Sequence, residues 1–204
     1  MEDYRTVKQE SAAEVEEKRS RFLAVLKPVQ TEEEAKLALE QVRRTHHAAR
    51  HHVYAWVLRN GGERCSDDGE PAQTAGMPVL EVLRHAGITD VILIVTRYFG
   101  GTLLGTGGLQ RAYTAAAKAA VEKAAVVTFT ACVRVSVSVP YALEQKIRYF
   151  AQQAGAAEEA PVYAEKAGLC FVLPQTKASG LAQGLQEMLR GGRADVSEPF
   201  YTLF

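Results

Sequence analysis

The sequence lacks several features that mark specialised classes of protein. Only 3 of its 204 residues are cysteine, at Cys65, Cys132 and Cys170, and no two of them form a Cys-x-x-Cys pair. This spacing argues against a disulfide framework or a cysteine zinc site and fits a reducing compartment. No run approaches the roughly 18 apolar residues of a membrane span, and the first residues lack the apolar core of a signal peptide. We therefore expect a cytoplasmic protein without membrane contact.

An excess of charge of either sign is also absent. The chain has 24 basic and 24 acidic residues and a formal net charge of +0. Without an overall basic field, any site for nucleic acid or another polyanion has to be local. Hydrophobic residues make up 47% of the chain, which is typical of a globular protein with a buried core.

Hydrophobic periodicity predicts an α+β fold with two domains, 1–130 and 131–204. In the first domain we expect strands at 21–29, 53–58 and 90–96, helices at 31–46, 79–86 and 109–125, and irregular segments at 63–78 and 100–108. In the second we expect strands at 128–139, 162–165, 169–173 and 194–203, and helices at 140–154 and 177–189, the last ended by Gly191 and Gly192. The second order is the ferredoxin-like βαββαβ pattern.

A glycine-rich segment between two arginines is the most unusual part of the chain. It contains Gly100, Gly101, Gly105, Gly107 and Gly108, with Arg97 and Tyr98 before them and Arg111 after them. Glycine lets backbone N–H groups converge on an anion, a helix N-terminus adds a positive dipole end, and arginine binds phosphate through paired N–H groups. The segment predicts an anion site; the alternative is a tight strand-to-helix connection. It matches neither the Walker loop nor the dinucleotide-binding fingerprint.

A second cluster is acidic. It consists of Ser66, Asp67, Asp68, Gly69, Glu70 and Pro71, followed by Thr74 and Gly76. Its three carboxylates suit a magnesium ion, general acid and base catalysis together with His51, or the capping of backbone N–H groups. The structural alternatives are a solvated turn and an acidic loop folded against Arg97 or Arg111. No other cofactor and no transition-metal site is suggested by the sequence.

A histidine-rich run, His46 to His52, is the one basic stretch without an acid. Arg50 and His51 in it are candidate contacts for a polyanion. Because neighbouring residues on a strand point to opposite faces, only one of His51 and His52 can face a given site. We expect the other histidines to form a surface cluster rather than a zinc site, because no carboxylate or cysteine stands at ligand spacing.

These motifs together resemble the IMPACT/YigZ family, over essentially the whole chain. The resemblance is carried by Lys18-x-x-Arg21-Phe22, Ala49 to His52, Ser66 to Pro71, Thr74-Ala75-Gly76-x-Pro78 and Arg97 to Tyr113. It implies a first domain like the second domain of small-subunit ribosomal protein five, and a second domain like the ferredoxin-like domain five of elongation factor G. Gln73 departs from the family, whose members often have a small residue there.

The resemblance also implies a link with translation. Eukaryotic relatives control translation initiation by competing for an activator of the general-control kinase, but through an additional N-terminal domain, so that partner is not transferred. We expect a non-enzymatic regulator that binds RNA or a ribosomal surface through the glycine-rich, arginine-flanked site. The alternatives are an enzyme for a phosphorylated or nucleotide ligand, with magnesium on the acidic loop, and a regulator that binds a protein partner.

Overall fold

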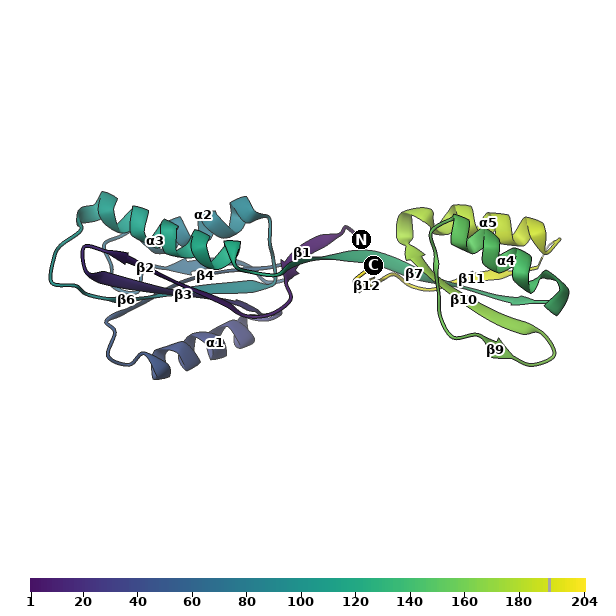
Figure 1. The fold of residues 1–204 in the computed structure, drawn as a ribbon, viewed down its shortest axis with the longest axis horizontal. Helices are drawn as coiled ribbons and strands as arrows, with labels where there is room; N and C mark the ends of the chain where they lie inside the picture. Colours follow the sequence, from purple (N-terminus) through teal and green to yellow (C-terminus); the bar gives the residue numbers. More distant parts are fainter. Residues whose placement is uncertain (191) are drawn as a thin grey trace. The chain divides into compact units, whose positions relative to one another are not determined.

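The chain forms two units, seen in a computed structural model that describes residues 1–190 and 192–204 (Figure 1). The first unit is Tyr4–Val127, and the second is Thr128–Phe204 together with Met1–Asp3. The expected division after residue 130 lies three residues further on, inside one continuous strand, β7 (Val126–Val139). The Asp3 carboxylate accepts a hydrogen bond from the backbone N–H of Ala131 at 3.0 Å, which ties the first residues to the second unit.

An antiparallel five-stranded sheet forms the centre of the first unit. Its order is β2-β3-β6-β4-β5, with helix α1 on one face and helices α2 and α3 on the other (Figure 1). The elements are β1 (Tyr4–Val7), β2 (Ser11–Glu17), β3 (Ser20–Pro28), α1 (Glu32–Thr45), β4 (His51–Leu58), β5 (Gly62–Ser66), α2 (Gly76–Ala86), β6 (Val91–Tyr98) and α3 (Gly105–Glu122).

Strand β6 is buried on both faces, which explains its unbroken apolar run. Val91, Leu93 and Val95 belong to the core under α2 and α3. Ile92 and Ile94 belong to the separate core under α1. A strand with helices over both faces has no solvent side, so the alternation of polar and apolar residues disappears.

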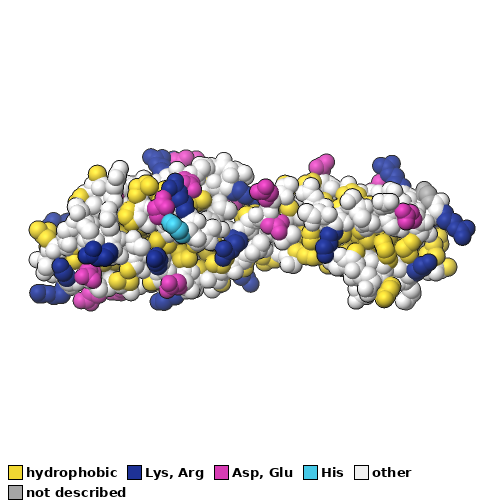
Figure 2. All heavy atoms as spheres, turned by 90° about the horizontal axis from the view of Figure 1, so that it is seen from above, with side chains coloured by type: hydrophobic (Ala, Val, Ile, Leu, Met, Phe, Trp, Pro, Cys, Tyr) yellow, Lys and Arg dark blue, Asp and Glu magenta, His cyan; other side chains and the backbone are white. Residues whose placement is uncertain are grey.

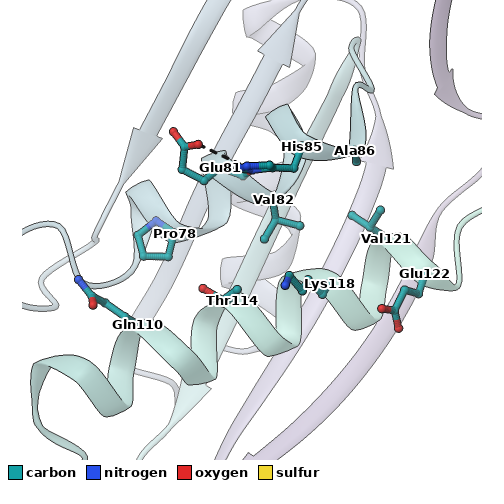
Figure 3. Close-up of a pocket in the computed structure, with 10 residues that line it drawn as sticks. All are labelled: Pro78, Glu81, Val82, His85, Ala86, Gln110, Thr114, Lys118, Val121 and Glu122. Carbon is teal, nitrogen blue, oxygen red and sulfur yellow. Dashed lines mark hydrogen bonds and ion pairs between the residues drawn. The ribbon is translucent and has the colours of Figure 1, made fainter.

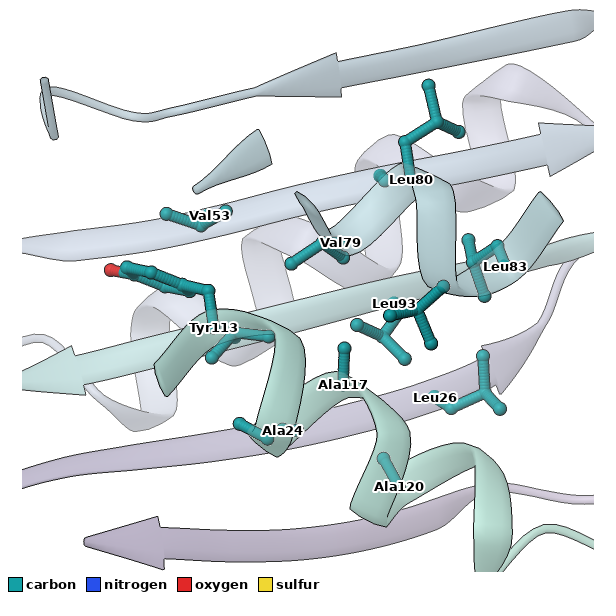
Figure 4. Close-up of a cluster of buried hydrophobic side chains, with 14 of the residues drawn as sticks. Ala24, Leu26, Val53, Val79, Leu80, Leu83, Leu93, Tyr113, Ala117 and Ala120 are labelled. Carbon is teal, nitrogen blue, oxygen red and sulfur yellow. The ribbon is translucent and has the colours of Figure 1, made fainter. Parts of the chain in front are cut away.

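Small side chains let α3 lie close to the sheet. Ala116, Ala117 and Ala120 are fully buried, and Figure 4 shows Ala117 and Ala120 near Ala24 and Leu26 of β3. The alanine content that predicts a helix therefore also sets how near its axis approaches the strands.

The predicted start of α1 is confirmed. Thr31 is the N-cap, and its hydroxyl accepts a hydrogen bond from the Glu34 backbone N–H at 3.2 Å. The Glu34 carboxylate in turn accepts from the backbone N–H of Gln30 at 2.6 Å. These bonds satisfy backbone donors that have no partner inside the helix.

Three strands of the first unit escaped prediction because they carry little apolar signal. Segment 63–78 is not irregular throughout: β5 covers Gly62–Ser66 and α2 starts at Gly76. Strands β1 and β2 were not expected at all. β2 and β5 are the edge strands of the sheet and are rich in charge, as edge strands often are.

The second unit has the predicted ferredoxin-like topology. Its strands follow the order β11-β7-β10-β8, all antiparallel, with β9 beside β10 and β12 beside β7. The remaining elements are α4 (Tyr141–Gln153), β8 (Ala157–Glu158), β9 (Val162–Tyr163), β10 (Ala167–Pro174), a short 3-10 turn at Gln175–Lys177, α5 (Ala178–Met188), β11 (Ala194–Val196) and β12 (Phe200–Thr202). Of the two glycines expected to end the last helix, Gly191 lies outside the described residues.

Two glycines of α5 have different surroundings and give a matched test of this packing. A Cβ added at Gly184 would lie 2.3 Å from the Phe150 ring, whereas one at Gly180 would meet no atom within 4 Å. Gly180→Ala should stabilise the protein by up to about 1 kcal/mol, because alanine favours a helix. Gly184→Ala should destabilise it by about 1 kcal/mol, because overpacking outweighs the same gain. Urea unfolding of the full chain measures both, and an equal effect of the two changes would contradict the packing.

Candidate functional site

The acidic loop between β5 and α2 is held by its own first carboxylate. Asp67 Oδ1 accepts hydrogen bonds from the backbone N–H groups of Ala75 and Gly76, at 2.9 and 2.8 Å. Its Oδ2 accepts from the backbone N–H of Gln73 at 2.9 Å. Ala75, the N-cap of α2, has no side chain able to cap the helix. Asp67 therefore supplies the cap from eight residues away.

Asp68 ties the loop to the histidine-rich run. Its carboxylate binds Arg43 at 2.7 Å and accepts from the backbone N–H of His52 at 2.7 Å. Its carbonyl oxygen lies 2.8 Å from Nδ1 of His51. One residue thus joins the end of α1, the start of β4 and the loop.

Glu70 is buried and forms an ion pair with Arg97. The side chains of Arg97 and Glu70 are only 7% and 3% exposed, and Arg97 donates to both carboxylate oxygens, at 2.8 and 3.1 Å. The hydroxyl of Tyr113 on α3 donates to the same carboxylate at 2.7 Å. Burial, and next the charge of Glu70, raise the pKa of Tyr113, so its hydroxyl keeps the proton that it donates.

These bonds favour the structural interpretation of the acidic loop. Each of its three carboxylates, on Asp67, Asp68 and Glu70, already accepts hydrogen bonds from the protein. A magnesium ion would have to displace those donors, and within residues 1–190 and 192–204 no three acidic, histidine or cysteine side chains are grouped as metal ligands. The carboxylates therefore do not fit magnesium well. The contacts of Glu70 agree with a structural alternative given above, an acidic loop folded against Arg97.

The other residues of the acidic motif shape the same loop. The Ser66 hydroxyl accepts from the backbone N–H of Asp68 at 3.1 Å, and the Thr74 hydroxyl donates to the Pro71 carbonyl at 2.6 Å. Gly69 lies against the ring of His51, and a Cβ on Gly76 would come within 2.7 Å of the Ser66 backbone. Gln73 adopts φ +62°, a left-handed conformation that glycine, without a Cβ, reaches at lower cost.

His51 and His52 point to opposite faces of the sheet, as predicted. His51 is paired with Arg97 in the register of β4 and β6, and Arg97 is paired with Phe22 of β3. This row lies on the face covered by α2 and α3. His52 is paired with Thr96 on the other face, and its Nδ1 lies 3.2 Å from the Thr96 hydroxyl.

The remaining histidines do not all form the surface cluster that we expected. His52 is buried because it lies inside the sheet under α1. His46 is half-buried, with its Nδ1 3.0 Å from the hydroxyl of Tyr98. The prediction was wrong for His52, because it belongs to the apolar strand β4 and is buried with it. Tyr98 is engaged by His46 and lies outside the cavity described below.

The glycine-rich segment is more regular than expected. Helix α3 begins at Gly105, so Gly105, Gly107 and Gly108 form its first turn instead of an irregular loop. Gly100 lies against β3, where an added Cβ would be 2.0 Å from the Arg19 backbone, so glycine is required there for close approach. Gly101 adopts φ +86° in the turn that follows. Part of this segment therefore serves backbone geometry, as the alternative interpretation held.

A cavity of about 540 Å³ opens at the start of α3 and gathers several predicted residues. Arg50, His51, Glu70, Pro71, Arg97 and Gly105 line it, together with Phe99, Leu103, Leu104, Thr106 and Leu109. Phe99 is 55% exposed and Leu103 is 83% exposed. The guanidinium of Arg97 lies between the rings of Phe22 and Phe99, 5.6 Å from each ring centroid.

The start of α3 lies at this cavity and has no side-chain cap among the described residues. Leu104, the N-cap, makes no side-chain cap bond, and no acidic residue stands in the first turn. Such a helix start is a favourable place for an anion. Nε of Arg97 is buried and has no hydrogen-bond partner among the described residues. A buried donor without a partner has a high free-energy cost.

Arg111 lies outside the cavity but reaches toward the same helix turn. It is exposed on α3, and a Cβ on Gly107 would lie 3.5 Å from its Nη1. Its guanidinium therefore lies beside the first turn of α3. Arg97 does not join it as a second free cation, because Glu70 neutralises Arg97.

A second and larger cavity, of about 670 Å³, lies between α2 and α3 (Figure 3). Figure 3 shows Val82 of α2 facing α3, with Glu81 and His85 on one side and Lys118 and Glu122 on the other. None of the residues predicted from sequence lines it. Its charged groups have both signs, so it offers no particular attraction to an anion.

Charges of both signs are mixed across the surface of the first unit. Figure 2 looks onto the side of α2 and α3, where basic and acidic side chains alternate among apolar ones. No broad basic face is visible there, in agreement with the balanced composition. Among the described residues, no helix combines the length and apolar character that crossing a bilayer requires.

Sequence reasoning missed Phe99, Leu103 and Tyr113 as parts of the site. Phe99 was visible beside the glycines as an aromatic residue in a segment that leaves a buried strand. Tyr113 was concealed because its spacing on α3 matches an ordinary core position, and only the fold brings it to Glu70.

The buried ion pair allows a direct test by double mutation. Glu70→Gln should destabilise the protein by about 3–5 kcal/mol, because it leaves the buried Arg97 charge without its counter-charge. Combining Glu70→Gln with Arg97→Met should cost clearly less than the sum of the single changes. Urea unfolding provides the free energies. Additive effects would show that the two side chains do not depend on one another.

Burial of His52 should make stability depend on pH. Burial lowers the pKa of His52 below its ordinary value of 6.5, so the unfolded chain binds a proton more readily than the folded one. The free energy of unfolding should therefore have its full value above pH 6.5. Below pH 6.5 it should fall with the pH, by at most about 1.4 kcal/mol per pH unit.

The comparison is between His52→Asn and His47→Asn, since His47 is exposed. Unfolding measured at several pH values between 5 and 7.5 should show a shallower slope for His52→Asn. The slope of His47→Asn should match that of the original protein. An equal slope in all three proteins would refute a role for His52.

Comparison with known proteins places both units. Residues 18–121 match the Impact N-terminal domain, and residues 137–191 match a domain of unknown function, DUF1949. A solved structure described as a hypothetical protein is similar over 96% of this chain and 97% of its own, with a TM-score of 0.63 and 32% identity.

Relatives are found in bacteria and in animals. IMPACT family member YvyE of Bacillus subtilis is 42% identical over 55% of this chain and 53% of its own length. IMPACT family member YigZ of Escherichia coli is 47% identical over 47% of this chain and 49% of its own. Protein IMPACT of Bos taurus is 30% identical over 53% of this chain and 36% of its own. The matches span about half the length of the bacterial relatives. Because the Impact N-terminal domain matches over half of this chain, the chain belongs to the IMPACT family.

Proposed function

We propose that this protein binds RNA, without catalysing a reaction, through the cavity at the start of α3, and that it acts on translation. The observation that carries the proposal is the gathering of Arg50, His51 and the uncapped start of α3 around one cavity. The link to translation is what the family resemblance implies.

The charges around the cavity favour phosphate. Arg50 is exposed and forms no ion pair within the described part of the chain, so its charge is available to a ligand. Arg111 adds a second exposed cation beside the first turn of α3. The helix dipole adds a further partial positive charge at Gly105. Arg97 and Glu70 cancel one another, so the local excess of positive charge comes from Arg50, Arg111 and the helix.

The size and lining of the cavity favour a nucleotide unit. A volume of about 540 Å³ lies in the range of small-ligand pockets. Phe99 and Leu103 present exposed apolar surface beside the cationic groups. An aromatic ring next to a phosphate site is the arrangement on which proteins stack the bases of single-stranded nucleic acid. Arg97 packs against the Phe99 ring from within and supports it.

The second unit supports the proposal less than its topology suggests. The open face of its sheet carries Arg134, Ser136 and Ser138 on β7. Arg134 forms an ion pair with Glu159 at 2.9 Å. Asp195 of β11 is paired with Ser136 in the register of β11 and β7. These groups give the face no excess of positive charge. We therefore assign the phosphate contacts to the first unit.

Salt dependence of binding tests the proposal. Single-stranded and hairpin RNA should bind in 50 mM salt and be released as salt rises, because phosphate contacts displace counterions. Arg50→Glu with Arg111→Glu should weaken binding of every sequence alike. It should also flatten the slope of log affinity against log salt by about 0.7 per lost contact.

The matched control is Lys146→Glu with Lys166→Glu, which makes the same change in charge at exposed positions of the second unit. This control should bind as the original protein does. Equal losses in both double variants would reduce the effect to net charge and contradict the site. If no RNA binds in 50 mM salt but mononucleotides raise the melting temperature, the same cavity would instead hold a free nucleotide.

A further inference from the structure

We infer that His51 reads the ribose 2′-hydroxyl and so makes the cavity selective for RNA over DNA. This inference rests on the proposed function and deepens it. The phosphate contacts described above are common to RNA and DNA, so they carry no information about the sugar. A group that distinguishes the two sugars has to meet the 2′-hydroxyl itself.

The hydrogen bond at Nδ1 fixes the chemistry of the His51 ring. Nδ1 lies 2.8 Å from the carbonyl oxygen of Asp68, and a carbonyl oxygen only accepts hydrogen bonds. Nδ1 therefore carries the hydrogen. In the neutral imidazole the other nitrogen, Nε2, is then left as an acceptor. No hydrogen bond joins Nε2 to another of the described residues.

The position of the ring makes that acceptor useful to a ligand. The edge of the ring that carries Nδ1 and Cε1 packs against Gly69, where an added Cβ would lie 3.5 Å from both atoms. His51 lines the cavity next to Arg50 and is paired across the strands with Arg97. The ring therefore lies within the proposed phosphate site, and its Nδ1 is already bonded to the acidic loop.

In the neutral ring, the acceptor Nε2 calls for a donor from the ligand. Phosphate oxygens are acceptors and would be repelled by the lone pair of Nε2. The 2′-hydroxyl is the donor that stands next to the phosphate in every RNA nucleotide and is missing from DNA. The charged groups around His51 are Arg50, the Arg97–Glu70 pair and the Arg43–Asp68 pair. Both pairs are neutral, so Arg50 is left for the phosphate and His51 for the sugar.

His51→Asn separates this role from a structural one. The asparagine amide nitrogen occupies about the place of Nδ1 and can still donate to the Asp68 carbonyl, but nothing replaces Nε2. His46→Asn is the matched control, because His46 contacts Tyr98 and lies outside the cavity. The probes are oligo(rU), oligo(dU) and 2′-fluoro oligo(U) of equal length, the last having no hydroxyl hydrogen to donate.

The original protein should bind oligo(rU) about 3- to 10-fold more tightly than the other two probes, as one hydrogen bond provides. His51→Asn should bind all three alike, whereas His46→Asn should keep the preference. A preference that survives His51→Asn, or the absence of any preference in the original protein, would overturn the inference. In both cases salt-sensitive binding that is lost in the Arg50 and Arg111 double variant would leave the proposed function standing. Absence of binding to every probe in 50 mM salt would overturn both.

Discussion

The buried ion pair between Glu70 and Arg97 is the interaction on which the first unit depends. It joins the acidic loop to the central strand β6, and Tyr113 extends it to helix α3. Two charges taken out of water are tolerated only when each has a partner and further hydrogen bonds. The positions of the loop, the strand and the helix are therefore tied to one another. The Phe99 ring joins the same arrangement, because its centroid lies 5.6 Å from the Arg97 guanidinium carbon.

The same pair changes how the motifs are understood. Arg97 and Glu70 look like ligand-binding groups in the sequence, whereas in the fold they neutralise one another. Asp67 caps α2 and Asp68 binds Arg43, so most of the acidic motif holds the fold together, and only Glu70 and Pro71 of it line the cavity. The groups left for a ligand are fewer: Arg50, His51, Arg111 and the start of α3. A family motif here describes the scaffold more than the contacts.

Much of the fold was predictable from local signals. Thr31 and its acidic first turn give the start of α1, and the apolar run of β6 gives the central strand. The order of elements in the second unit follows from alternating and helical spacing. Edge strands β2 and β5 were not predicted, because one or both of their faces meet solvent and they therefore carry few apolar residues. The early start of α3 was hidden because glycine normally argues against a helix.

The candidate site was predictable in part, and for a similar reason. Strand alternation correctly separated His51 from His52. Partners that come from distant segments, such as Tyr113 for Glu70 or Arg43 for Asp68, depend on how elements pack and leave no mark in local spacing. The sequence therefore left open whether the acidic loop is a solvated turn or folds against an arginine. The choice depends on where the fold places Arg97 of β6 and Tyr113 of α3.

The division between exposed and buried arginines has a practical consequence. Mobile ions screen charges at the surface far more than charges in the interior. Concentrated salt would therefore loosen a polyanion held by Arg50 and Arg111 while the pair inside the first unit keeps its attraction. A nucleic acid carried along from the cell can then be washed from the folded protein without denaturant, and the material recovered in the wash would identify what the protein holds in its native setting.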